Sequence, residues 1–122
     1  MKNLNKEVGN FGEDLSKKYL KENGYIIIEE NFSCPYGEID IIALSDKYLC
    51  FMEVKTRYTT KFGLPLESIT PAKQRKIIKT AQYFICKNKL FKHFCRFDAL
   101  EVTFTNDSNF PKINHIKNAF SQ

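Results

Sequence analysis

The spacing of apolar residues predicts a helix and then a strand in the first third of the chain. Residues 6–23 place apolar side chains at helical intervals, and Asn23-Gly24 is a typical C-terminal stop signal. Residues 25–32, YIIIEENF, are rich in β-branched and aromatic residues, and a Cys-Pro-Tyr-Gly turn follows at residues 34–37. This segment therefore predicts one helix, one strand and a tight turn.

A β-hairpin is predicted next, with strands at residues 38–44 and 48–56. If Asp46 and Lys47 form a two-residue loop, Asp40 lies opposite Glu53 and Glu38 lies opposite Lys55. Facing side chains share one face of a sheet, so all four charges are expected within about 8 Å of one another. A three-residue loop would instead put Asp40 and Glu53 on opposite faces.

The second half of the chain predicts one more helix and one or two more strands. After a loop at residues 57–68, Thr70 as N-cap and Pro71 at the first helical position predict a helix to about Asn88. Its expected buried stripe consists of Ile77, Ile78, Ala81, Phe84 and Ile85. Residues 96–104 alternate as a strand, and residues 112–120 form a short strand or a docked tail. The order α-β-β-β-α-β predicts a single α/β domain over residues 1–122, with helices flanking a small mixed sheet.

The four charges in the apolar hairpin need an explanation, because ionised groups are costly to bury unpaired. Two carboxylates about 5 Å apart repel by about 3 kcal/mol at an effective dielectric constant of about 20. A divalent cation between Asp40 and Glu53 reverses that sign, and oxygen ligands without His or Cys suit Mg²⁺ or Mn²⁺. The alternative is an edge salt bridge between Glu38 and Lys55, with both other carboxylates pointing to solvent.

Composition adds a preference for a polyanionic partner. The chain has 19 Lys and Arg against 14 Asp and Glu, a net charge of +5. Its four cysteines lack C-x-x-C spacing, so neither a zinc site nor a disulfide framework is expected, and Cys50 and Cys86 are expected to pack as small hydrophobic residues. Because no signal-peptide or membrane-spanning pattern is visible, we expect a cytoplasmic protein with no membrane partner.

Several motifs resemble known nuclease families. Asp40 followed by Glu53-Val54-Lys55 resembles the signature of the PD-(D/E)xK nuclease superfamily, which includes restriction endonucleases and archaeal Holliday-junction resolvases. From about residue 8 to residue 120 the chain more specifically resembles the bacterial YraN family of small predicted endonucleases. The segments that carry this resemblance are GNFGEDLSKKYLKENGYIIIEENF, YGEIDIIA, FMEVKTR, FGLPLESITPAKQRKI and RFDALEV. Ser16, where an alanine is usual, and Thr59-Thr60 are small departures.

The resemblance implies a restriction-endonuclease-like αβββαβ core with a catalytic metal site for Mg²⁺ or Mn²⁺. It implies that Asp40 and Glu53 bind the metal, that Lys55 is the third catalytic element, and that Glu13 joins the metal site from the first helix. It also places Gln74 near the site. Glu38 is expected to orient Lys55 or a water rather than to bind the metal.

The residues around Glu13 and Gln74 support these two additions. Glu13 shares a helix face with small residues, which let a helix approach its neighbour closely, although a first-turn acid also favours the helix dipole. Gln74 lies one turn before Ile78, so it points toward the sheet and needs a hydrogen-bond partner.

Basic residues after the predicted site are candidates for binding the DNA backbone, although a solvated helix face explains any single one of them. They are Arg57, Lys61, Lys73, Arg75, Lys76 and Lys79. His93 and His115 are isolated in the sequence and are expected to be surface or packing residues.

These observations predict a metal-dependent DNA endonuclease, acting on branched or single-stranded DNA in repair, recombination or uptake. The alternative is a nucleic-acid-binding module on a nuclease fold that is inactive alone or needs a partner. The loop with Phe62, Leu64 and Leu66 is the one candidate for an adaptor surface or a homodimer contact.

Overall fold

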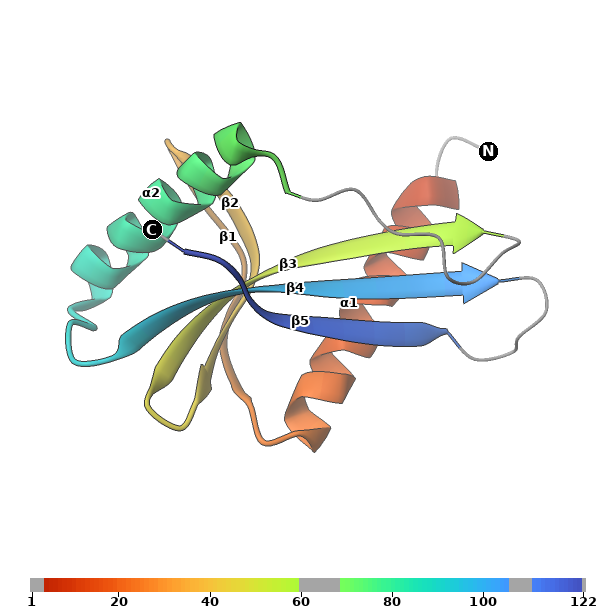
Figure 1. Ribbon diagram of the computed structural model, residues 1–122, viewed down its shortest axis with the longest axis horizontal. Helices are drawn as coiled ribbons and strands as arrows, with labels where there is room; N and C mark the ends of the chain where they lie inside the picture. The colour runs from red at the N-terminus through yellow and green to blue at the C-terminus, as the bar shows by residue number, and fades with distance from the viewer. Residues whose placement is uncertain (1–3, 60–68, 106–110, 122) are drawn as a thin grey trace.

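The computed structural model describes residues 4–59, 69–105 and 111–121. They form α1 (Leu4–Glu22), β1 (Ile26–Cys34), β2 (Gly37–Ser45), β3 (Tyr48–Thr59), α2 (Pro71–Asn88), β4 (Phe94–Thr105) and β5 (Lys112–Phe120) (Figure 1). The sheet has the order β1-β2-β3-β4-β5, in which β3 and β4 are parallel and the other neighbours are antiparallel. This is an α/β fold with a mixed sheet, consistent with the expected restriction-endonuclease-like core.

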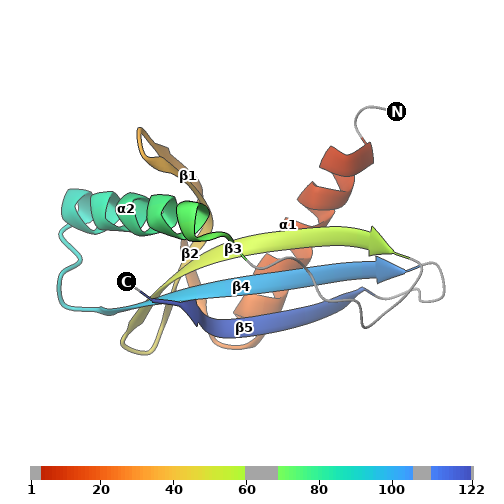
Figure 2. The same ribbon diagram turned by 45° about the horizontal axis from the view of Figure 1, so that its top comes forward.

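Helix α2 covers one face of the sheet, against β1 and β2 (Figure 2). The Thr70 side chain accepts a hydrogen bond from the N–H of Lys73, so this helix begins with the predicted cap. Its predicted stripe is confirmed: Ile77, Ala81 and Phe84 are buried, and the two remaining isoleucines are partly buried in the same core.

Helix α1 packs on the opposite face, against β3, β1 and β4. Leu20 is fully buried there with Met52 and Leu100. A Cβ at Gly12 would collide with the Thr56 side chain, so the small residue is what allows α1 to lie this close to β3. The expected close approach of α1 is therefore confirmed.

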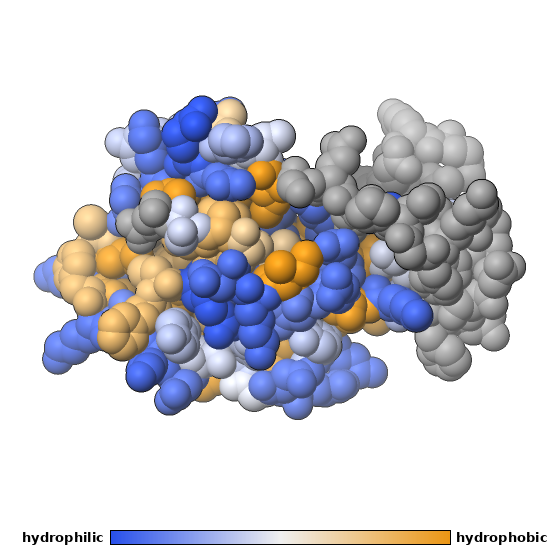
Figure 3. Space-filling model, in the orientation of Figure 1, coloured by the Kyte–Doolittle hydropathy of each residue, from blue (hydrophilic) through white to orange (hydrophobic). Residues whose placement is uncertain are grey.

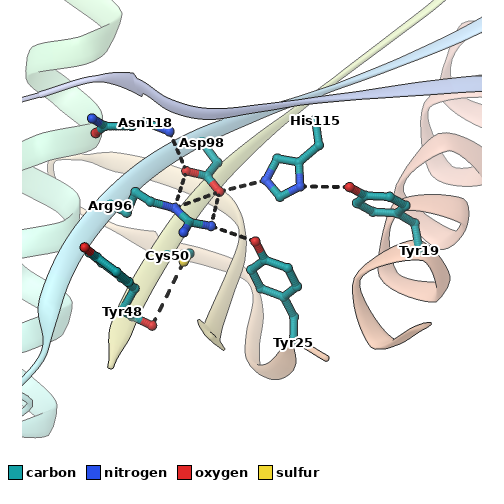
Figure 4. A network of polar contacts seen from close by, with 8 residues as sticks. All are labelled: Tyr19, Tyr25, Tyr48, Cys50, Arg96, Asp98, His115 and Asn118. Atoms are coloured by element: carbon teal, nitrogen blue, oxygen red, sulfur yellow. Dashed lines mark hydrogen bonds and ion pairs between the residues drawn. The ribbon is translucent and has the colours of Figure 1, made fainter. Parts of the chain in front are cut away.

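A buried polar network connects β5 to β4 on the face of the sheet that α1 covers (Figure 4). Asp98, 1% exposed, accepts hydrogen bonds from Arg96 Nε at 3.0 Å, His115 Nε2 at 2.8 Å and the Asn118 N–H at 3.0 Å. Burial acts to raise the pKa of Asp98, but the hydrogen bonds from His115, Arg96 and Asn118 outweigh it and hold the pKa below its ordinary value. Because an ionised carboxylate only accepts, His115 Nε2 carries the proton.

The same network reaches α1 and the start of β1. Tyr25 accepts a hydrogen bond of 2.7 Å from Arg96, and the Tyr19 hydroxyl lies 3.1 Å from His115 Nδ1. His115 is therefore a packing residue, one of its two expected roles, and its partner Asp98 is distant in sequence but adjacent in the sheet. His93 is half-buried.

Most predicted element boundaries are confirmed to within a few residues. Residues 112–120 form a strand rather than a docked tail.

Cys50 is buried as expected, but Cys86 is exposed, because it lies on the solvent side of α2. All four cysteines are free. No helix among the described residues is long and apolar enough to span a membrane.

Candidate functional site

The candidate site lies where β2 and β3 separate. Their ladder begins at Ser45 and Tyr48, on either side of the two-residue turn, and ends at Ile41 and Met52. The predicted register is therefore confirmed, and Asp40 and Glu53 are the next facing pair beyond the ladder. They line a pocket of about 210 Å³, here named the carboxylate pocket, together with Gly37, Glu38, Lys73, Lys76 and Ile77.

Asp40 is held in the gap between the two strands. Its Oδ2 accepts a hydrogen bond of 2.7 Å from the N–H of Val54. Burial raises the pKa of Asp40 to about 6, and the negative charges of Glu53 and Glu13 add to the rise, whereas the Val54 N–H and the Lys73 charge oppose it. Burial, more than the neighbouring charges, therefore disfavours the ionised form of Asp40.

Glu53 has a cationic partner from α2. Its side chain is 12% exposed, and its Oε1 lies 2.6 Å from the Lys73 ammonium. Lys73 is in the first turn of α2, where the Thr70 cap fixes the direction of the helix. Lys73, which is also a candidate for binding the DNA backbone, forms an ion pair with one of the two carboxylates.

Glu13, on α1, does not line the carboxylate pocket. It lines a separate pocket with Asp14, Lys17 and Asn31. Burial raises the pKa of Glu13, Lys17 opposes the rise, and the charges of neighbouring acids, including Glu53, add to it. Glu13 is therefore close enough to interact electrostatically with the pair. No group of three His, Cys, Asp or Glu side chains in the described part of the chain is placed to bind one ion jointly.

The predicted pairing of Glu38 with Lys55 is not formed between the described strands. Beyond Ile41 and Met52 the ladder between β2 and β3 ends, and each of the two residues keeps only the partner on the other edge of its strand: Ser33 of β1 for Glu38 and Glu101 of β4 for Lys55. Glu38 still lines the carboxylate pocket, whereas Lys55 does not. Lys55 follows Glu53 by two residues on β3, and its side chain leaves the same face of that strand.

Gln74 has the backbone partner that its position requires. Its Nε2 donates a hydrogen bond of 2.8 Å to the carbonyl of Ile69, immediately before α2. The side chain is partly buried and does not line the carboxylate pocket. In this structure Gln74 thus fixes the entry into α2.

The predicted DNA-binding residues are spread over two elements. Arg75, Lys76 and Lys79 are exposed on α2, and Lys76 also lines the carboxylate pocket. Figure 3 shows hydrophilic side chains gathered over the start of α2. Arg57 lies on β3, and Lys61 falls outside the described residues, as does the loop with Phe62, Leu64 and Leu66.

Comparison with known proteins places this site within a family. The model of the uncharacterised protein family UPF0102 matches residues 12–102, which include Glu13, Asp40, Glu53 and Lys55. A UPF0102 protein of Clostridium perfringens is 49% identical over 120 residues, covering 98% of each chain. One from Clostridium botulinum is 50% identical over 118 residues, covering 95% of each, and one from Clostridium kluyveri is 45% identical over 120 residues, covering 98% of each. The chain therefore belongs to the UPF0102 family, which is the YraN family that its motifs resemble.

Proposed function

We propose that the protein is a divalent-metal-dependent DNA endonuclease that hydrolyses phosphodiester bonds at the carboxylate pocket. The observation that carries the proposal is the pairing of Asp40 with Glu53 at the separation of β2 and β3. Burial and the neighbouring charges raise the pKa of Asp40 to about 6, so the folded chain resists ionising it. A cation that binds both carboxylates would remove this penalty. Cation binding therefore explains the pair, whereas packing of the core does not.

The donor atoms fit Mg²⁺ or Mn²⁺. Carboxylate oxygens from Asp40 and Glu53 would hold the ion, and no His or Cys lines the pocket. Mg²⁺ binds through one or two carboxylates and fills its other positions with waters and substrate phosphate oxygens, so two ligands suffice. We expect Glu13 to contribute from α1 through a water, because it is not placed to bind one ion jointly with Asp40 and Glu53.

In this proposal the chain binds and orients the phosphodiester for attack by water. When bound, a divalent cation lowers the pKa of water and stabilises negative charge on the phosphate. Lys76 lies at the pocket with an exposed ammonium, placed to attract the phosphate, and Arg75 and Lys79 extend the positive surface along α2. Lys55 would orient the attacking water or stabilise developing charge as a compact cation.

The ion pair between Lys73 and Glu53 favours a second candidate. If the Lys73 ammonium neutralises Glu53 permanently, the site holds no metal and the protein binds nucleic acid without cutting it, alone or until a partner displaces Lys73. The Lys73–Glu53 distance of 2.6 Å is what supports this alternative. Metal dependence distinguishes the two candidates, because only the nuclease needs the cation.

The test is a cleavage assay on labelled branched, single-stranded and duplex DNA. The purified protein is incubated with Mg²⁺, Mn²⁺ or EDTA, beside Asp40→Asn and a control variant, Glu29→Gln, which removes an exposed acid of β1. We expect cleavage with either metal, none with EDTA, and none by Asp40→Asn. DNA binding that depends on salt but not on metal, without cleavage, would favour the binding module instead.

A further inference from the structure

A groove beside the carboxylate pocket carries exposed aromatic rings with basic neighbours. This groove, which we name the tyrosine groove, has a volume of about 380 Å³. It is lined by Tyr36, Lys79, Gln82, Tyr83 and Cys86. Tyr36 comes from the turn between β1 and β2, and the other residues come from α2. Figures 1 and 2 both show this turn standing beside α2.

The two tyrosines are anchored but not buried. Tyr83 packs against the core residue Phe32 with ring centroids 6.2 Å apart, and Tyr36 meets Tyr83 edge-on at the same separation of 6.2 Å. Tyr36 is nevertheless 52% exposed and Tyr83 is 39% exposed. Neither hydroxyl has a hydrogen-bond partner among the described residues. Rings held in position with open faces are suited to stacking on a planar ligand.

The groove adjoins the carboxylate pocket. Tyr36 lines the groove and the next residue, Gly37, lines the pocket. On α2, Lys76 lines the pocket and Lys79 lines the groove. The two lysines are three residues apart, which is less than one helical turn; a full turn rises about 5.4 Å. A cationic side chain therefore flanks each of the two sites, along a path from the tyrosines to the carboxylates.

We propose that the tyrosine groove binds an unpaired nucleobase of a DNA strand whose phosphate backbone runs along Lys79 and Lys76 into the carboxylate pocket. This inference rests on the proposed function. Stacking needs an exposed base face, which an unpaired strand offers and an intact duplex does not. The backbone charge complements the two lysines, and the Gln82 amide at the groove can hydrogen-bond to a base edge. The preferred substrate is therefore DNA with an unpaired strand, as in single-stranded or branched DNA.

The test separates stacking from electrostatic attraction. A short labelled single strand and an abasic strand of the same length carry the same charge but differ in their bases. Their dissociation constants are measured by fluorescence anisotropy in the Asp40→Asn background, so that cleavage does not interfere. The substitutions are Tyr36→Leu and Tyr83→Leu, which keep apolar bulk, and Tyr36→Phe and Tyr83→Phe, which keep the rings. Phe91→Leu is the matched control, because Phe91 is 67% exposed beyond the end of α2.

We expect the parent protein to bind the normal strand about tenfold more tightly than the abasic strand, as base stacking on aromatic rings predicts. The two leucine variants should bring this ratio close to one without weakening abasic binding, whereas the phenylalanine variants and Phe91→Leu should preserve it. A ratio that the leucine variants leave unchanged, or a parent ratio near one, would overturn the inference. If that result came with metal-dependent cleavage by the wild-type protein, the proposed function would stand. Failure of the protein to bind or cut any DNA would overturn both.

Discussion

The Asp40 carboxylate accepts a hydrogen bond of 2.7 Å from the N–H of Val54, at the point where β2 and β3 part. In a continuous antiparallel ladder, a backbone carbonyl of β2 would accept this N–H. Here a side chain replaces that carbonyl, so the break in the sheet itself fixes the position of a carboxylate. The acid is both a structural partner of the backbone and half of the candidate metal site.

Asp40→Asn should separate these two roles. The asparagine Oδ1 can still accept the Val54 N–H, but the charge is lost. The pKa of Asp40 is raised in the folded state to about 6. Asp40 therefore contributes favourably to the free energy of unfolding below about pH 4, and this contribution is lost as pH rises through 6. At about pH 8 the free energy of unfolding of the variant should therefore be at least equal to that of the wild type, and higher by at most about 3 kcal/mol. Urea denaturation measures this, with Glu29→Gln as the control.

The cleavage assay on the same Asp40→Asn sample should show no activity. Loss of cleavage in a protein of undiminished stability would assign the charge of Asp40 to the reaction. A fall in stability of several kcal/mol would show that the ionised carboxylate is needed for the fold.

The pH dependence of cleavage should follow the ionisation of Asp40. Only the ionised form binds a cation well, so the rate should rise about tenfold per pH unit below about pH 6 and then level off. Raising the Mn²⁺ concentration should move this limb to lower pH, because the cation competes with the proton. Initial rates at two metal concentrations measure both effects. A rate independent of pH between about 5 and 7 would contradict the assignment.

Replacement of Lys73 by methionine should strengthen binding of a divalent cation in the absence of DNA. The Lys73 ammonium lies 2.6 Å from Glu53 and competes with the cation for that carboxylate. Since the lysine side chain is 47% exposed, solvent screens the ion pair, and we expect only about a two- to fivefold gain in affinity. Isothermal titration calorimetry with Mn²⁺ measures it, with Lys87→Met at the other end of α2 as the control. Equal affinities for Lys73→Met and wild type would show that the ion pair does not compete with the metal.

Asp98→Asn should lower the free energy of unfolding without changing the rate of DNA cleavage. The substitution leaves the Arg96 guanidinium, whose side chain is 15% exposed, without its charged partner, and weakens the bond to His115. Removing one member of a buried ion pair costs about 3 kcal/mol in unfolding free energy. The midpoint of urea denaturation should fall, while cleavage per folded molecule stays unchanged. Lost cleavage at undiminished stability would instead place this network in the active site.

Local signals in the sequence predicted the elements and the first pair of the site. Thr70 and Pro71 marked the start of α2, and the two-residue turn between Ser45 and Tyr48 set the register that aligns Asp40 with Glu53. The period of a strand does not reveal where two strands separate. The expected Glu38–Lys55 pairing therefore failed beyond Met52.

The contacts that sequence reasoning missed join residues distant along the chain. Asp98 and His115 meet because β5 pairs with β4 in a register that sets His115 opposite Leu100, diagonally across from Asp98 on the same face of the sheet. A signal was present, since an aspartate inside the apolar run FDAL requires a buried partner. Its partner was hidden because neither strand alone reveals the register in which β5 pairs with β4.

Binding of Mn²⁺ in the absence of DNA tests the central claim most directly, because it asks what the Asp40–Glu53 pair is for. Electron paramagnetic resonance of free Mn²⁺ is followed as wild-type protein, Asp40→Asn, Glu53→Gln or the control Glu29→Gln is added. Wild type and control should remove Mn²⁺ from solution with saturable binding, and each pocket variant should bind at least about tenfold more weakly. Binding by Asp40→Asn equal to that of wild type, or no binding by any of the four proteins, would contradict the central claim.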